Sequence, residues 1–178
     1  TATTAGMTSL AAGTYNYVVT DANGCTKSGT ATVQEPSIIS VSAKAKTSVS
    51  CNGGSTGAVN ITVTGGSPIG SPTYTYAWTG PSSFTASTQN ITALKAGRYD
   101  VTITDANSCT GTDSVLISEP SAISISNTKV DVLCNGNSTG SIDLTIAGGV
   151  TAYSKSWTGP SSYSNNTEDI NTLAAGSY

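Results

Sequence analysis

Residues 51–66 read CNGGSTGAVNITVTGG, and residues 134–149 read CNGNSTGSIDLTIAGG. This stretch decides the fold because it contains the complete pattern of one strand and its turns. Val59, Ile61 and Val63 alternate with polar residues, and glycines stand on both sides. An alternation of period two predicts a half-buried β-strand, and the flanking glycines predict turns at its ends.

Other phrases recur along the chain at a similar spacing. LAAGTYNYVVTDANGCT begins at Leu10 and returns as LKAGRYDVTITDANSCT at Leu94, while WTGPSS occurs at 78–83 and again at 157–162. A period of this kind is the signature of tandem structural repeats, here of about 80 residues. The tripeptide Glu-Pro-Ser ends a unit, since proline stops a strand and stiffens a junction. We therefore predict that 1–36 is the C-terminal part of one repeat, 37–120 a complete repeat, and 121–178 the N-terminal part of the next.

The predicted fold is all-β. Charged residues make up only 10% of the chain, and Val, Ile and Thr are frequent while strong helix formers are scarce. Short strands separated by Gly, Pro, Asn and Asp turns predict immunoglobulin-like antiparallel β-sandwich repeats arranged end to end. A tryptophan in a central strand (Trp78, Trp157) and a tyrosine that opens a later strand (Tyr15, Tyr99, Tyr178) fit this architecture.

Composition argues against several function classes. The seven basic residues are scattered and the net charge is −3, so a nucleic-acid partner is not expected. No apolar run approaches the roughly 20 residues that span a bilayer, and we expect no membrane insertion. The chain has no histidine, and its ten carboxylates are dispersed, so no nucleophile has an evident base. We expect no enzyme and no bound cofactor.

Cys25, Cys51, Cys109 and Cys134 fall at two repeating positions of the unit. In a secreted β array, an even count at such positions predicts disulfides rather than zinc ligands. Three pairings remain open. One joins Cys51 to Cys109 within a unit, and a second, slightly favoured, joins Cys25 to Cys51 and Cys109 to Cys134 across the junctions. The third joins each cysteine to a partner in a stacked neighbour outside this chain.

Two further groups of residues are candidate sites. The Asp-Ala-Asn phrases at 21–23 and 105–107 offer oxygen ligands for calcium, but Asp and Asn also favour tight turns, which is the stronger interpretation. Tyr76 alternates with Tyr74 and Trp78, so these aromatic residues share a face. Trp78 is expected in the core, whereas Tyr76 is a candidate for stacking on a sugar ring. In the next repeat, Lys155 occupies the position equivalent to Tyr76. This indicates either a bulge in the strand or a position at the solvent-exposed margin of the core.

In combination, these phrases resemble the SprB-type repeats of cell-surface adhesins in gliding Bacteroidota. The resemblance rests on Cys51-Asn52-Gly53, Gly65-Gly66, the aromatic strand that ends at Trp78, residues 94–99 and 104–110, and Glu119-Pro120. It implies a long protein that is secreted across the outer membrane and displayed on the cell surface. In that setting Asp113-Ser114-Val115 is similar to an O-glycosylation signal, so Ser114 is a candidate modification site.

The function expected from these observations is structural. The chain is predicted to be a segment of an extracellular adhesin or fibre that attaches to surfaces, or serves gliding, through many weak contacts. Its expected partners are neighbouring repeats, polysaccharide or abiotic surfaces, and identical chains in a filament. Two alternatives are a carbohydrate-binding module centred on Tyr76 and a self-assembling extracellular filament subunit.

Overall fold

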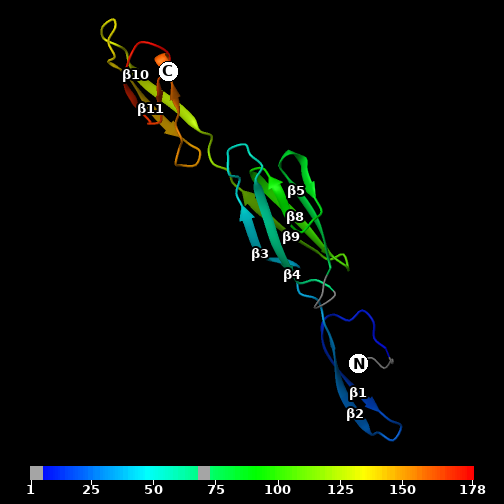
Figure 1. The fold of residues 1–178 in the computed structure, drawn as a ribbon. Helices are drawn as coiled ribbons and strands as arrows, with labels where there is room; N and C mark the ends of the chain where they lie inside the picture. The colour runs from blue at the N-terminus through cyan, green and yellow to red at the C-terminus, as the bar shows by residue number, and fades with distance from the viewer. Residues whose placement is uncertain (1–5, 68–72) are drawn as a thin grey trace.

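The computed structural model describes residues 6–67 and 73–178, and antiparallel sheets account for its regular structure. The described residues contain no α-helix, only the two short 3-10 turns Pro81–Ser83 and Pro160–Ser162. Figure 1 shows three bodies that follow one another along an extended line, with the N-terminal hairpin at one end and residues 121–178 at the other. The all-β prediction is confirmed. The segment boundaries at 36 and 120 stay predictions.

The middle body is a sandwich of two sheets. One sheet has the order β3 (Ser40–Thr47), β4 (Gly57–Thr64), β7 (Ile91–Leu94), and the other has the order β6 (Phe84–Ala86), β5 (Tyr74–Gly80), β8 (Gly97–Asp105), β9 (Thr110–Ile117). All neighbouring pairs are antiparallel. This is the immunoglobulin-like arrangement predicted from the alternating strands and the tryptophan position.

Alternation along each strand creates the core of the sandwich. On β4 the side chains of Val59 and Ile61 point inward, and on β8 those of Val101 and Ile103 meet them from the other sheet. Trp78 is 2% exposed, and its indole Nε1 donates to the Thr88 carbonyl at 2.9 Å, so its polar atom is satisfied inside the core. Each fully buried aliphatic side chain stabilises the fold by about 1.5–3 kcal/mol relative to exposure.

A tyrosine corner is present in all three bodies. The hydroxyl of Tyr99 donates to the Lys95 carbonyl at 3.0 Å, and the ring packs edge-on against Phe84 with centroids 5.2 Å apart. Tyr15 and Tyr178 donate in the same way to the carbonyls four residues before them, at 2.8 and 3.2 Å. The repeated phrase therefore builds the same local structure each time, as the sequence predicts.

The paired glycines that follow β4, and their counterparts in the third body, turn the chain back over the start of each unit. Gly65 has φ 87° and Gly148 has φ 77°, a left-handed conformation that L side chains rarely adopt. A Cβ atom at Gly65 would collide with the Ile38 carbonyl oxygen, and one at Gly148 with the Ala122 carbonyl oxygen. Both the dihedral and the close approach require glycine here.

The two flanking bodies have only part of the middle sandwich. The first is the hairpin of β1 (Gly13–Thr20) and β2 (Thr26–Val33). The third has one sheet of β10 (Ser124–Val130), β11 (Gly140–Ala147) and β14 (Ile170–Leu173) and a short pair, β12 (Trp157–Thr158) and β13 (Ser164–Asn165). Their apolar side chains are correspondingly more exposed than those of the middle body.

Candidate functional site

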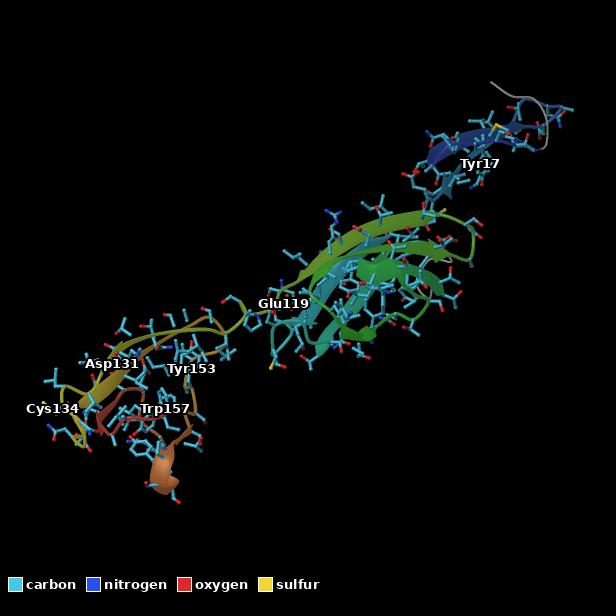
Figure 2. All side chains as sticks on the ribbon, turned by 90° about the horizontal axis from the view of Figure 1, so that it is seen from above. Tyr17, Glu119, Asp131, Cys134, Tyr153 and Trp157 are labelled. Atoms are coloured by element: carbon cyan, nitrogen blue, oxygen red, sulfur yellow. The ribbon has the colours of Figure 1, made fainter. Side chains whose placement is uncertain are left out.

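The junction between the middle and third bodies is held by the loop between β3 and β4. The backbone N–H of Gly53 donates to Glu119 Oε2 at 2.7 Å, and the Asn52 side-chain amide donates to Glu119 Oε1 at 3.3 Å. The same amide also donates to the Pro120 carbonyl at 3.0 Å. Figure 2 shows Glu119 at the narrow connection between the two bodies. Asn52, Gly53, Glu119 and Pro120 form what we call the junction clamp.

On the other side of the junction, the third body holds Ser121, the residue after Pro120, by a hydrogen bond. The N–H of Gly149 donates to the Ser121 carbonyl at 2.8 Å, and at the preceding junction Gly66 donates to the Ser37 carbonyl at the same distance. Asn52 and Gly149 thus hold two consecutive carbonyls, those of Pro120 and Ser121, one from each body. The Asn-Gly, Gly-Gly and Glu-Pro-Ser phrases therefore meet at one joint and restrict it.

A shallow hollow of about 480 Å³ spans this joint. Its lining comes from both bodies and includes Ser50, Cys51 and Pro120 on one side and Ile123, Gly149 and Val150 on the other. Val150 is 65% exposed, so the hollow has an apolar rim. Sequence reasoning identified the phrases that build this joint but not their contact. The sequence does contain one clue to this contact. Asn52-Gly53 and Glu119-Pro120 belong to motifs that recur once per unit, and neither motif shows the alternation of apolar and polar residues that a strand requires.

The disulfides predicted from the sequence are not supported. Cys25, Cys51, Cys109 and Cys134 are free and exposed in the structure. Within the middle body, Cys51 lies in the loop beside Glu119, whereas Cys109 lies in the β8–β9 turn, where the N–H of Asp105 donates to its carbonyl at 3.0 Å. These two loops are at opposite ends of the sandwich, so the pairing of Cys51 with Cys109 cannot form.

The favoured pairing across the junctions is also wrong. It requires the strands on either side of the Glu-Pro-Ser tripeptide to fold back as a hairpin, but β2 and β3 belong to separate sheets. Cys25 precedes β2 and Cys51 follows β3, and each of these strands has 8 residues. A strand of this length extends about 26 Å, whereas a disulfide needs Cα atoms within about 7 Å. Pairing with a stacked neighbour outside this chain stays a prediction.

The Asp-Ala-Asn phrases form tight turns. Oδ1 of Asp105 accepts the N–H groups of Asn107 and Cys109, both at 2.9 Å, and Oδ2 accepts the N–H of Ser67 at 2.8 Å. Burial raises the pKa of Asp105, but the hydrogen bonds from these N–H groups outweigh it and hold the pKa below its usual range. Asp21 binds the N–H groups of Asn23 and Cys25 in the same way. The described residues contain no group of three acidic, Cys or His side chains placed to hold a metal.

Tyr76 lies half-buried on β5 and packs against the core of the middle sandwich. Its ring meets that of Tyr74 edge-on, with centroids 6.5 Å apart. Burial raises its pKa. The register between β5 and β8 is continuous, so the position of Tyr76 is a margin of the core and not a bulge. Its counterpart Lys155 pairs with Glu168 at 3.3 Å. Sugar contact by Tyr76 stays a prediction.

Ser114 lies half-buried in β9, opposite Asp100 of β8. Lys44 of β3 donates to the Ser114 carbonyl at 3.3 Å and pairs with the neighbouring Asp113 carboxylate at 2.8 Å. Burial raises the pKa of Asp113, and the hydrogen bond from Lys44 lowers it, with a net result below the usual range. These contacts join the edges of the two sheets. Modification of Ser114 stays a prediction.

Comparison with known proteins places these features in a family. The model of the SprB repeat matches residues 43–83 and 126–162, which occupy equivalent positions in the middle and third bodies. Over these two segments the chain carries the SprB repeat. No curated protein matches the chain. The SprB match includes the loop that supplies Asn52 and Gly53, but it ends before Glu119, so the junction clamp joins a matched region to a residue outside it.

The SprB repeat is a structural repeat, and its association with cell-surface adhesins makes this chain an adhesin-associated repeat segment. No helix of the described residues is long and apolar enough to cross a membrane.

Proposed function

We propose that this chain is a segment of a long secreted adhesin or fibre on the outer surface of the cell, in which SprB repeats act as stiff spacers with many weak contacts. The observation that carries the proposal is the junction clamp. It fixes the carbonyl of Pro120 to one repeat, while Gly149 fixes that of Ser121 to the next. A joint that is restrained on both sides in this way limits bending between repeats. The array then extends away from the cell.

Attachment then depends on the number of weak contacts along the fibre and not on one tight binding site. Weak contacts that are held on one fibre act at high effective concentration, so avidity rises far above the affinity of a single repeat. The half-buried position of Tyr76 against the core fits a spacer better than a sugar-binding platform. The partners we propose are neighbouring repeats and, along the fibre, polysaccharide or abiotic surfaces, either in static attachment or during gliding.

The test compares arrays of one, two, four and eight copies of residues 37–120, coupled to beads at equal repeat density. Retention on polysaccharide-coated and bare glass under flow is the readout. The proposal expects little retention by one copy and a rise steeper than linear with copy number. Tyr76→Ala serves as the discriminating variant and is expected to leave retention unchanged. Strong glycan binding by a single copy that Tyr76→Ala abolishes would replace the spacer with a carbohydrate-binding module.

A further inference from the structure

The first and last strands of the middle repeat, β3 and β9, lie edge to edge and run in the same direction. Lys44 of β3 pairs with the Asp113 carboxylate of β9 at 2.8 Å and donates to the Ser114 carbonyl at 3.3 Å. Two residues further along both strands, Lys46 donates to the Leu116 carbonyl at 3.0 Å. A step along β3 is thus matched by an equal step along β9, which makes the two strands parallel. Because they belong to different sheets, lysine side chains join the two sheet edges here.

The same alignment continues beyond the ends of the two strands. The hydroxyl groups of Ser48 and Ser118 share a hydrogen bond of 2.9 Å. The backbone N–H of Val49 donates to the Ser118 carbonyl, also at 2.9 Å. We call this row of contacts between residues 44–49 and residues 113–118 the β3–β9 seam. It connects the two sheets along one side of the sandwich.

The seam lies between the two points at which tension along the chain enters the middle repeat. The preceding body is connected to the start of β3 through Ser37, and the following body to the end of β9 through Glu119. These two connections are at opposite ends of the middle body (Figure 1). A pull along the chain therefore draws the start of β3 and the end of β9 in opposite directions. It slides one strand along the other and loads the seam in shear.

The direction of loading decides how strongly such contacts resist. Contacts that are loaded in shear share the force and must break together, whereas contacts that are peeled from one end break one after another. Apolar packing in the core is non-directional, while the seam opposes sliding with hydrogen bonds and an ion pair. Exposed contacts of this kind add little to equilibrium stability. Forced unfolding, however, depends on the unfolding barrier, so the seam can raise the rupture force without raising stability.

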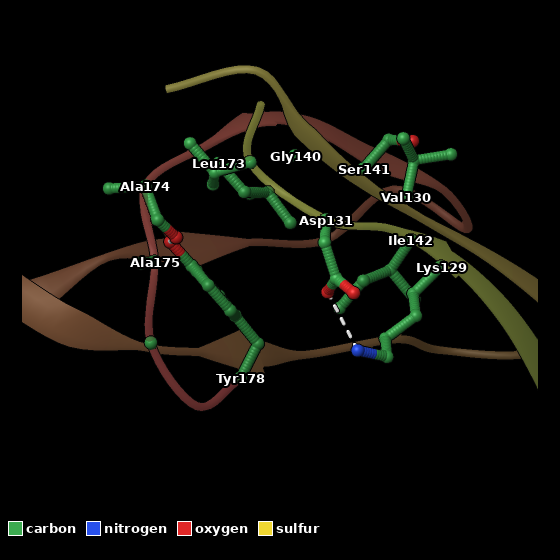
Figure 3. A pocket seen from close by; sticks show the side chains of 12 residues that line it. Lys129, Val130, Asp131, Gly140, Ser141, Ile142, Leu173, Ala174, Ala175 and Tyr178 are labelled. Atoms are coloured by element: carbon green, nitrogen blue, oxygen red, sulfur yellow. Dashed lines mark hydrogen bonds and ion pairs between the residues drawn. The ribbon is translucent and has the colours of Figure 1, made fainter. Parts of the chain in front are cut away.

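The third body repeats a lysine of the seam. Lys129 lies on β10 opposite Ile142, in the same register as Lys46 opposite Val59 on β3 and β4. Its ammonium group pairs with Asp131 at 2.7 Å, as the dashed line in Figure 3 marks. A lysine at this strand edge is therefore a feature of both bodies and not of the middle repeat alone.

We propose that the β3–β9 seam makes the middle repeat a force-bearing module that resists tension along the chain. The inference rests on the proposed fibre for the source of that tension, but the seam itself is built within one repeat. It differs from the junction clamp, which limits bending between repeats. The seam limits sliding between the two sheets of a single repeat, and its resistance is specific to a pull from end to end.

The experiment stretches the full 178-residue chain in optical tweezers in two geometries, with Cys25, Cys51 and Cys134 replaced by serine. Handles at the two termini load the seam in shear. A handle at the N-terminus and one on the exposed thiol of Cys109, which precedes β9, pull on the same end of both strands and peel the seam open. Rupture of the middle repeat is recognised in the first geometry by a gain in length of roughly 250 Å. The expected rupture force is at least about twofold higher in shear than in peeling.

Lysine variants separate the seam from general stability. The double variant Lys44→Met, Lys46→Met removes the donors and is expected to lower the shear rupture force to about half. The peeling force and the urea midpoint should change little. Lys95→Met, which removes an exposed charge before β8, is the matched control and should change neither force.

Two results would overturn the proposal. One is an equal rupture force in the two geometries for the chain with its lysines intact, which tests the seam even if the double variant folds poorly. The other is a double variant that lowers both forces in the same proportion. Loss of bead retention under flow with the shear resistance preserved would instead count against adhesion and leave the seam in place.

Discussion

Replacing Glu119 with alanine removes the carboxylate that joins the β3–β4 loop to the end of β9. The variant loses the Gly53 hydrogen bond of 2.7 Å and the longer Asn52 bond of 3.3 Å. Glu119 is exposed, so solvent screens both bonds, and we assign the pair a contribution of about 1 kcal/mol. That amount changes an equilibrium about fivefold. The fraction of molecules with an open clamp should therefore rise about fivefold in Glu119→Ala.

The assay measures the distribution of distances between spin labels on the two bodies. Labels at Thr62→Cys on β4 and Thr145→Cys on β11 occupy equivalent exposed positions, with the four native cysteines replaced by serine. Glu119→Ala should broaden the distribution, since an open clamp frees the backbone of Glu119 and Pro120. Glu35→Ala is the matched control because it changes the same tripeptide at the other junction, where the described residues supply no clamp loop.

A second readout separates the clamp from an unrelated loss of structure. Urea unfolding of Glu119→Ala, Asn52→Ala and the double variant gives a coupling energy. The clamp predicts a coupling of about 0.5–1 kcal/mol, since the two side chains share a hydrogen bond. An unchanged distance distribution in Glu119→Ala, or single effects that simply add, would refute the argument that this contact stiffens the joint.

Two further predictions concern the turns that shape each repeat. Because hydrogen bonds hold the pKa of Asp105 below its usual range, its contribution to stability is present above the unfolded-state pKa of about 4 and is lost as the pH falls through the lower folded-state value. Asp105→Asn should therefore shrink the difference between urea midpoints measured at about pH 5 and about pH 2.5. The half-buried Asp100, which pairs with Arg98, provides the control variant Asp100→Asn. An undiminished difference in Asp105→Asn would contradict the assignment. Gly65→Ala should destabilise the middle repeat by about 2–4 kcal/mol, through both the positive φ and the collision with the Ile38 carbonyl, while Gly53→Ala should cost only about 1 kcal/mol because open space surrounds that position. Thermal unfolding compares these two glycine variants, and equal losses of stability would show that the close approach at Gly65 contributes nothing.

Much of the repeat follows from local pattern. The alternation of Val59, Ile61 and Val63 predicts β4, and the tyrosine that opens β8 predicts a corner that Tyr99 forms. These features depend on neighbours close in sequence, which is why one sequence suffices to find them. The misfit at Lys155 also has a local origin, since the position of Tyr76 lies at the margin of the core.

The contacts between distant segments were not predictable in the same way. The cysteines illustrate this, because their even count and repeating positions suggested pairing, yet pairing depends on which end of the sandwich each loop occupies. Cys51 and Cys109 are separated by the length of the strands between them. The residues around Asn52 likewise show no local pattern that predicts a hydrogen bond from its amide to Pro120, 68 residues away. Long-range placement of loops is set by the topology of the whole sandwich.

The distribution of apolar and polar phrases along the unit explains how a repeat of ordinary strands can serve as a spacer. The alternating strands of the middle repeat form a buried core from side chains of that repeat alone. The Asn-Gly, Gly-Gly and Glu-Pro-Ser phrases contribute little to that core, and their hydrogen bonds converge on Ser121 and its neighbours instead. Stability and stiffness are thereby assigned to different residues. Substitutions at the joint should change the shape of the array while leaving each sandwich folded, which is the property that the proposed extracellular fibre requires.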